Sequence, residues 1–273
     1  MARGGTFIIN VYCAGMDFLQ AIILSIIEGI TEFLPVSSTG HLILASNFLK
    51  IPQTEFLKSF EIFIQLGAIL AVLTLYYKHF LKDCKMFTKV LVAFLPTAVL
   101  GLVFYKVVKQ FLLGNMMVTI VALFIGGVLF IIFERFYKEE RHSKIYEIKH
   151  ITFAKALWMG LFQSIAMIPG VSRSAATIFG GMTLGLDRKT SVEFSFLLAI
   201  PTMIAATSFD IYKSSFAFAA EEYWLLAAGF IGAFITALLA VKFFLKYIEK
   251  NTFTWFGIYR IAIAAIFWIL IVM

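Results

Sequence analysis

Long apolar runs alternate with short polar stretches along this chain, at a spacing typical of helical membrane proteins. Six runs are each about 20 residues long, the length of helix that crosses about 30 Å of hydrocarbon. They lack the period-two alternation of membrane β-strands, so the pattern predicts an all-α polytopic fold. The six predicted transmembrane helices cover residues 59–78, 86–105, 115–134, 190–209, 222–245 and 253–273.

Two further apolar regions, residues 17–49 and 152–186, are interrupted by proline, glycine and hydroxyl residues. Each half is too short to cross the bilayer comfortably, so we expect each region to form a re-entrant helical hairpin. Non-helical backbone at membrane depth is tolerated only where it is buried in protein or lines a water-filled cavity. The alternative is a single transmembrane helix kinked at Pro35 or at Pro169.

The two halves of the chain repeat. An offset of 135 residues aligns Glu28 with Gln163 and Ser37 with Ser172. Each repeat holds one hairpin and three transmembrane helices, and an odd number of crossings inverts the second repeat. The hairpins then enter from opposite faces and meet near the midplane. We therefore expect an N-terminal extension (1–16) and one membrane domain (17–273), with inverted-topology repeats at about 17–150 and 151–273.

Composition excludes an ordinary soluble domain. The chain is 61% hydrophobic and 14% charged, against roughly 45–50% and 25% for soluble domains. The net charge of +7 lies in short loops, where it sets membrane orientation, so no nucleic-acid partner is expected. Six Lys or Arg fall on the side of the N-terminus and thirteen on the other side, which predicts that the second side is cytoplasmic.

Glu28 and Glu32 are four residues apart, so they share one face of the first half-helix. A charge placed inside a membrane costs at least roughly 2.5–3.5 kcal/mol, which makes such residues functional candidates. Adjacent carboxylates repel unless a cation or a shared proton intervenes. The pair therefore suits a divalent metal or a general base. The alternative is a polar stripe that faces water or pairs with Arg173.

Ser37, Ser38, Thr39 and His41 open the second half-helix of the first hairpin. A helix N-terminus offers free N–H groups and a partial positive charge, which attract phosphate. Ser38 is a candidate nucleophile with His41 as its base, and Ser37 and Thr39 are candidate substrate-binding hydroxyls. The alternative is that the hydroxyls only cap the helix.

The corresponding half-helix of the second repeat opens with Ser172, Arg173 and Ser174, and Thr177 follows one turn later. Arginine binds phosphate oxygens through a bidentate fork, and the three hydroxyls could add further contacts. An ion pair between Arg173 and one of the two glutamates is the structural alternative, and an empty site could use it. Arg260, inside the last predicted helix, is interpreted as snorkelling or ion-paired rather than functional.

Two half-helix N-termini, a guanidinium and carboxylates that converge describe an anion site. A nucleophile with a base indicates a phosphatase, and the surrounding hydrocarbon indicates a lipid substrate. A transporter or flippase of a lipid phosphate would use the same architecture and remains the rival hypothesis. Transport alone does not need a nucleophile and a base.

Two motifs resemble the bacterial undecaprenyl-diphosphatases, the bacitracin-resistance family of lipid phosphatases. The first motif is Glu28-Gly29-Ile30-Thr31-Glu32-Phe33-Leu34-Pro35-Val36-Ser37-Ser38-Thr39-Gly40-His41. The second motif is Pro169-Gly170-Val171-Ser172-Arg173-Ser174, followed by Ala175 where the family usually has glycine. Residues 60–67 and 193–199 are also similar to the family.

This resemblance implies removal of the terminal phosphate of undecaprenyl diphosphate, a polyprenyl diphosphate lipid. The product is the carrier lipid for peptidoglycan. The resemblance also implies a multi-pass enzyme of the bacterial inner membrane, a site facing the periplasm and dependence on Mg²⁺ or Ca²⁺. Glu28 and Glu32 would be the acidic pair and Arg173 the diphosphate clamp. Whether Ser38, His41 or water attacks phosphorus stays open, as does the choice between a monomer and a homodimer.

Overall fold

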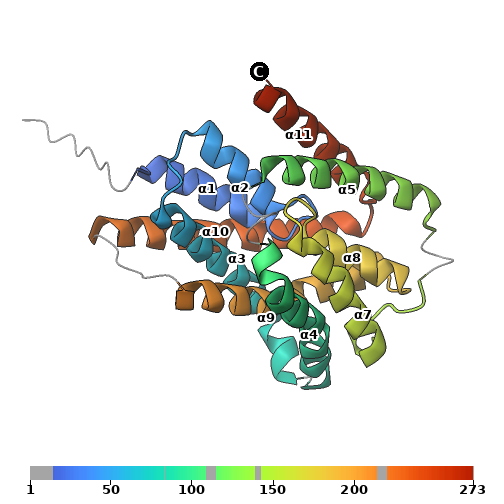
Figure 1. Cartoon of the computed structure of the whole chain (residues 1–273). Helices are drawn as coiled ribbons and strands as arrows, with labels where there is room; N and C mark the ends of the chain where they lie inside the picture. Colours follow the sequence, from blue (N-terminus) through green and yellow to red (C-terminus); the bar gives the residue numbers. More distant parts are fainter. Residues whose placement is uncertain (1–14, 83, 109–114, 139–142, 214–219, 273) are drawn as a thin grey trace, which may run out of the picture.

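The computed structural model describes residues 15–82, 84–108, 115–138, 143–213 and 220–272, and the described part is entirely helical apart from one isolated bridge (Figure 1). Residues 1–14 of the expected N-terminal extension lie outside it. Two short 3-10 turns, η2 (Ile148–His150) and η3 (Ile165–Met167), flank α7. The α-helices are α1 (Phe18–Thr31), α2 (Ser38–Phe48), α3 (Glu55–Lys82), α4 (Cys84–Val107), α5 (Met116–Phe136), α7 (Phe153–Ser164), α8 (Arg173–Thr183), α9 (Arg188–Lys213), α10 (Ala220–Ile248) and α11 (Thr254–Val272).

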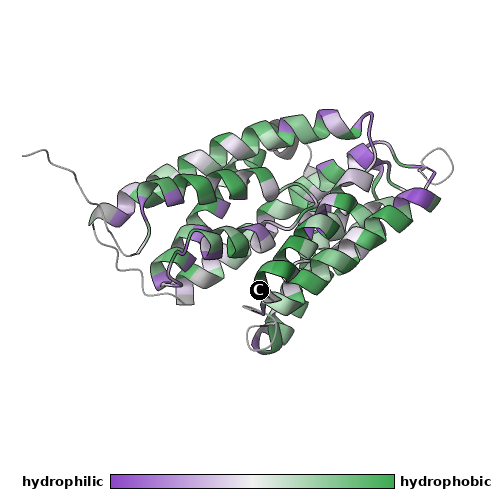
Figure 2. Ribbon diagram, turned by 90° about the horizontal axis from the view of Figure 1, so that it is seen from above, coloured by the Kyte–Doolittle hydropathy of each residue, from purple (hydrophilic) through white to green (hydrophobic). Residues whose placement is uncertain are grey.

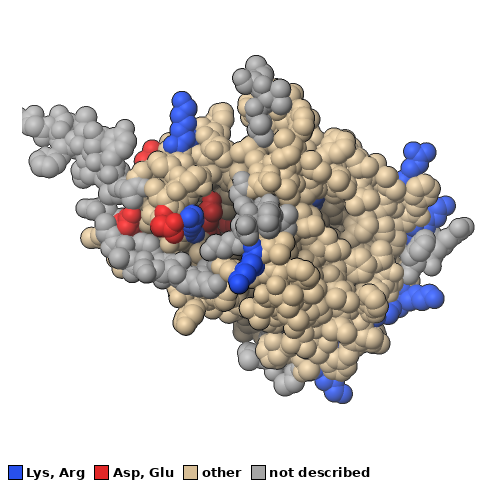
Figure 3. Space-filling view, viewed as in Figure 1, with Lys and Arg blue, Asp and Glu red and all other residues tan. Residues whose placement is uncertain are grey.

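Five helices are long and apolar enough to cross a membrane: α3, α4, α5, α9 and α10. They confirm five of the six predicted spans and define an integral membrane protein. The sixth predicted span forms α11, whose described apolar stretch, Thr254–Leu270, is shorter. Hydrophobic residues dominate the helices in Figure 2. Figure 3 shows a broad uncharged surface, with several Lys and Arg along the right edge and a second group of charges, both basic and acidic, at the left.

Each interrupted region is broken into two helices, as the sequence predicts. The first break separates α1 from α2, and the second separates α7 from α8 through η3. The paired helices pack against each other, α1 on α2 and α7 on α8. The interruptions therefore turn the chain back on itself at Pro35 and at Pro169-Gly170.

Helix contacts exchange between the two halves of the chain. The repeat matches α1 to α7, α3 to α9, α4 to α10 and α5 to α11. Accordingly α1 packs on α10 while α7 packs on α4, and α3 packs on α10 while α9 packs on α4. The matched helices α3 and α9, and α5 and α11, also contact each other. Each half therefore packs its first short helix against the other half.

Glycine allows the two exchanged contacts to be close. A Cβ added at Gly29 of α1 would lie 2.7 Å from the carbonyl oxygen of Ala233 in α10. A Cβ added at Gly160 of α7 would lie 1.9 Å from the carbonyl oxygen of Ala93 in α4. Inside a bilayer, small residues of this kind let helix backbones approach and pack by van der Waals contact.

Replacing Gly160 with alanine should force α7 away from α4. We expect Gly160→Ala to lower the unfolding free energy by up to about 2 kcal/mol, which is the usual overpacking cost of about 1–3 kcal/mol less the gain in helix propensity of about 1 kcal/mol. Thermal or denaturant unfolding in detergent measures the change. Gly101→Ala in α4 is the matched control, because its added Cβ would meet only the Met167 Sδ atom, at 4.0 Å. Equal stability of the two variants would contradict the prediction.

Candidate functional site

Both interrupted loops end on a serine with a left-handed backbone. Ser37 precedes α2 with a φ of 72°, and Ser172 precedes α8 with a φ of 74°. Such conformations cost on the order of 1–3 kcal/mol for a residue other than glycine and persist where the surroundings impose them. The repeat aligns these two serines, so both half-helices begin in the same strained manner.

The two serines differ in what their hydroxyls do. Ser172 Oγ accepts a hydrogen bond from the backbone N–H of Ala175 at 3.3 Å, so it caps α8. Ser37 makes no side-chain capping bond to α2. The capping alternative for the first hairpin therefore does not describe Ser37, whereas the equivalent Ser172 does cap its helix.

Glu32 joins the two loops. Its Oε2 atom accepts a hydrogen bond from Ser38 Oγ at 2.5 Å, and its Oε1 atom accepts one from Arg173 Nη2 at 2.9 Å. Side-chain exposures of 5% for Glu32 and 13% for Arg173 make this a buried ion pair. The guanidinium is also fixed by Nη1, which donates to the carbonyl oxygen of Ser195 at 3.0 Å. The structural alternative for Arg173, a pair with a glutamate, is thus present.

A cavity of about 250 Å³ lies against this ion pair. Six of the predicted site residues line it, and both loops contribute. Gln65 of α3 and Thr202 of α9 also line it and were not foreseen, because each lies in a predicted transmembrane helix outside the two interrupted loops. The predicted residues at the cavity are Glu32, Ser37, Ser38, Thr39, Ser172 and Arg173.

Glu28 is buried behind the cavity, and neither carboxylate oxygen has a hydrogen-bond partner in the described part of the chain. The carboxylates of Glu32 and Glu61 are close enough to repel it. The described residues hold no cluster of three or more His, Cys, Asp or Glu that suits a metal. Glu28 and Glu32 therefore fit a divalent cation only if other oxygens, such as those of a phosphate, complete its coordination.

His41 faces away from Ser38. Its Nδ1 atom lies 2.8 Å from the carbonyl oxygen of Ser37, and its Nε2 atom lies 2.7 Å from the hydroxyl of Tyr259 in α11. A carbonyl only accepts, so Nδ1 carries the hydrogen and Nε2 accepts from Tyr259. Within the described residues, Ser38 bonds to Glu32 and no hydrogen bond joins it to His41. The predicted pairing of Ser38 with His41 is not the one that this structure contains.

Ser174 and Thr177 are fully buried and lie off the cavity. Ser174 Oγ donates to the carbonyl oxygen of Leu34 at 2.9 Å and so ties the second loop to the first. Thr177 Oγ1 lies 2.5 Å from Ser195 Oγ, which ties α8 to α9. Both hydroxyls brace the site, and their predicted contact with substrate stays a prediction.

Arg260 corrects an interpretation from the sequence. It neither snorkels nor forms one of the ion pairs found among the described residues, because its side chain is 0% exposed and donates only to backbone carbonyls. A sequence pattern cannot predict backbone carbonyl partners of this kind, because every residue has a carbonyl.

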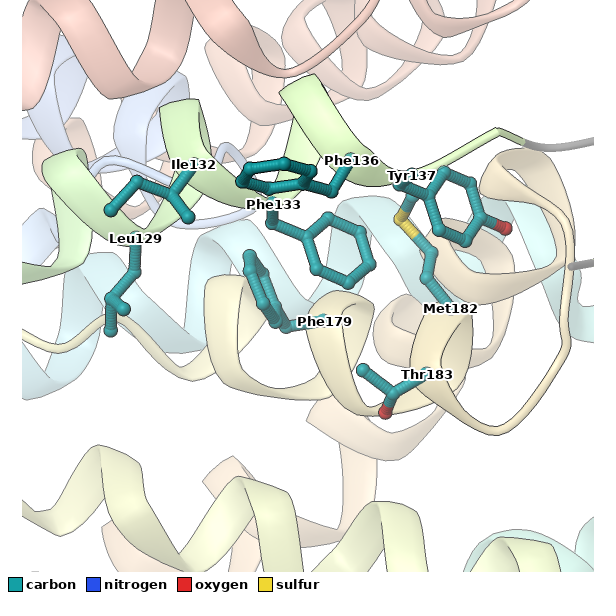
Figure 4. Close-up of a pocket in the computed structure, with 8 residues that line it drawn as sticks. All are labelled: Leu129, Ile132, Phe133, Phe136, Tyr137, Phe179, Met182 and Thr183. Atoms are coloured by element: carbon teal, nitrogen blue, oxygen red, sulfur yellow. The ribbon is translucent and has the colours of Figure 1, made fainter.

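A larger hollow of about 460 Å³ lies between α5 and α8 (Figure 4). Its only polar side-chain groups are two hydroxyls, so it offers no charge to a phosphate and suits hydrocarbon. Of these two cavities, the smaller one has the charged and polar side chains that an anion would need. The residues around the apolar hollow are Leu129, Ile132, Phe133, Phe136, Tyr137, Phe179, Met182 and Thr183.

The apolar helices define an integral membrane protein, and its buried cavity brings together a guanidinium, a carboxylate and several hydroxyls. The chain belongs to the family described as bacitracin resistance protein BacA, whose model matches residues 21–266.

Similar proteins cover nearly the whole chain. It is 49% identical over 248 residues to the undecaprenyl-diphosphatase of Aquifex aeolicus, which spans 91% of this chain and 96% of that protein. It is 50% identical over 254 residues to the undecaprenyl-diphosphatase of Sulfurihydrogenibium sp., with 93% and 99% covered. The protein of the same description from Persephonella marina is 50% identical over 252 residues, with 92% and 98% covered.

The hydrogen bond from the Tyr259 hydroxyl to His41 should contribute to the rate of the reaction. We expect Tyr259→Phe to reduce kcat/KM for phosphate release by about 2- to 12-fold, the equivalent of one net hydrogen bond of roughly 0.5–1.5 kcal/mol. Steady-state kinetics in detergent measure the change. Tyr212→Phe, at a side chain that is 86% exposed, is the control. If the two variants have equal kinetics, the bond from Tyr259 to His41 has no part in the reaction.

Proposed function

We propose that this chain hydrolyses undecaprenyl diphosphate to undecaprenyl phosphate and inorganic phosphate. The reaction regenerates the carrier lipid for peptidoglycan synthesis and confers resistance to bacitracin. The observation that carries the proposal is Glu32, which binds a serine hydroxyl and an arginine at one buried cavity. Relatives described as undecaprenyl-diphosphatases, about half identical over more than nine tenths of the chain, support the same activity.

Substrate binding would exchange the partners of Arg173. A diphosphate that enters the cavity offers oxygens that compete with Glu32 for the guanidinium, whose Nε atom is buried without a partner in the described part. Arginine holds phosphate in two parallel hydrogen bonds, and the N-termini of α2 and α8 add N–H groups. Once Arg173 turns to the phosphate, Ser38 is the remaining hydrogen-bond partner of the Glu32 carboxylate in the described part of the chain.

Glu32 is then placed as the general base. The Ser38 oxygen attacks the outer phosphorus and passes its proton to Glu32, while the bond from that phosphorus to the bridging oxygen breaks. Undecaprenyl phosphate leaves with the bridging oxygen. Water then cleaves the phosphoserine, releases inorganic phosphate and restores the hydroxyl. Direct attack by water, or attack by His41, predicts retained activity without the Ser38 hydroxyl.

A divalent cation would bind between Glu28, Glu32 and the diphosphate. The unpartnered oxygens of Glu28 support this assignment. When bound, Mg²⁺ or Ca²⁺ would neutralise charge on the phosphate oxygens. Two carboxylates with substrate oxygens are a usual Mg²⁺ environment.

The membrane arrangement we propose has six transmembrane helices and two re-entrant hairpins, in two inverted repeats. The exchanged helix contacts and the matching backbone of Ser37 and Ser172 support it. We place the protein in the bacterial inner membrane, with the more basic side cytoplasmic. The cavity is lined by Thr202 and Ala206 from the half of α9 that approaches the less basic side, so it would open to the periplasm.

Phosphate release from a polyprenyl diphosphate by the purified protein tests the proposal. We expect Arg173→Ala and Ser38→Ala to lose at least about 100-fold in kcat, as for other groups that stabilise a transition state. Arg188→Ala is the matched control, because Arg188 forms a similarly buried pair with Glu134 at 2.7 Å, at the other end of α9 from the cavity. Full activity of Ser38→Ala would exclude the serine as nucleophile.

The same variants address the rival hypothesis. A transporter of polyprenyl phosphate would move lipid across vesicle membranes without releasing phosphate, and it would need Arg173 but not Ser38. No phosphate release by folded wild-type protein, together with Arg173-dependent lipid movement, would replace the enzyme proposal with transport.

Removing the charge of Glu28 should weaken cation binding. We expect Glu28→Gln to raise the Mg²⁺ or Ca²⁺ concentration for half-maximal activity by on the order of tenfold or more, the range seen when metal sites lose supporting groups. Metal titration after treatment with a chelator measures this. Glu61→Gln, at a neighbouring carboxylate outside the cavity lining, is the comparison. An unchanged metal requirement in Glu28→Gln would exclude Glu28 as a ligand.

A further inference from the structure

Arg260 is hydrogen-bonded to both loops of the site at once. Its side chain is fully buried in α11, and the ion pairs found in the described part of the chain do not include it. Each nitrogen of the guanidinium donates to backbone carbonyl oxygens. Nη1 reaches Pro35 at 3.2 Å and Val171 at 3.0 Å, Nη2 reaches Gly170 at 2.8 Å and Ala122 at 3.2 Å, and Nε reaches Leu123 at 3.4 Å.

These bonds fix the direction of one peptide at the cavity. The carbonyl of Val171 and the N–H of Ser172 belong to the same planar trans peptide, so they point in opposite directions. Because Arg260 holds the carbonyl, the N–H of Ser172 points away from Arg260. Ser172 lines the cavity, and its N–H has no acceptor among the described residues. This N–H is a free donor at the start of α8.

Only an arginine suits this position. The guanidinium has five N–H groups in a rigid fork and can serve several carbonyls, whereas a lysine has three donors on one atom. It also keeps its charge when buried. Its positive charge forms no ion pair with a carboxylate of the described residues, so it adds to the attraction that the two helix N-termini exert on an anion.

We propose that Arg260 is a positioning residue of the diphosphate site. It hydrogen-bonds the carbonyls of both loops on the side away from the cavity, so that the N–H of Ser172 faces the incoming phosphate. It also supplies a positive charge that no ion pair among the described residues neutralises. The proposal rests on the diphosphatase function, in which Ser172 and Arg173 bind phosphate.

Gly126 of α5 gives a way to displace the guanidinium without removing it. A Cβ added at Gly126 would lie 2.2 Å from Arg260 Nη2 and 2.8 Å from its Cζ. Gly126→Ala must therefore push the fork away from its carbonyls, while every polar group of the site stays in the chain. Gly101→Ala is again the control, since a Cβ added there would meet only the Met167 Sδ atom, at 4.0 Å.

The test measures kcat and KM for a polyprenyl diphosphate, together with the thermal shift that inorganic diphosphate produces. We expect Arg260→Lys and Gly126→Ala to lose about tenfold or more in kcat/KM, because deleting one transition-state donor costs roughly 100- to 1,000-fold and these variants misdirect one without deleting it. We also expect both variants to lose the stabilisation by inorganic diphosphate. Gly101→Ala should match wild type in both. If Arg260→Lys fails to fold, Gly126→Ala carries the test.

Gly126→Ala with wild-type kinetics and a wild-type thermal shift would overturn the proposal. So would activity that falls only in proportion to the folded fraction, because that result describes a purely structural arginine. Failure of the diphosphatase function is a separate result: wild type would release no phosphate, while the thermal shift by inorganic diphosphate would still report on the geometry that Arg260 imposes.

Discussion

A polar group that leaves water for a hydrocarbon environment must find its partners inside the protein. Glu32 meets this constraint with Ser38 of its own loop and with Arg173 of the other loop, which lies 141 residues further along the chain. Ser174 adds a bond to the carbonyl of Leu34, and Arg260 binds carbonyls of both loops. The loops therefore form one hydrogen-bonded unit. The cavity exists because polar groups of each broken helix find their hydrogen-bond partners in the other broken helix.

The two repeats share a frame but contribute different chemistry. Where the first repeat has Glu28, the second has Gln163, whose Nε2 atom donates to Thr97 at 2.9 Å and to Thr202 at 3.0 Å. Gln163 thus secures α7 to its neighbours, while Glu28 keeps two unpartnered oxygens. Ser38 of the first repeat likewise corresponds to Arg173 of the second. The first repeat contributes the hydroxyl and the carboxylates, and the second contributes the guanidinium of Arg173.

The sequence predicts the helices well, because the length of an apolar run depends on the membrane and not on tertiary contacts. It also finds Ser38, Glu32 and Arg173, since charge and hydroxyl residues stand out against hydrocarbon. Their connections are less accessible. The bond from His41 to Tyr259 joins residues 218 positions apart, and helix periodicity does not fix which faces meet. Side-chain bonds to carbonyls leave no compositional trace, which is why Arg260 was underestimated.

The exchanged packing has a consequence for biosynthesis. Helix α7 finds its partner α4 already made, because α4 precedes it in the chain. Helix α1, which carries Glu28, packs through Gly29 on α10, and α10 begins only at Ala220. During insertion from the ribosome, α1 must wait without the surface that finally covers it until most of the protein has been translated. Its equivalent in the second half, α7, can dock as soon as it emerges, so structural equivalence does not extend to the order of assembly.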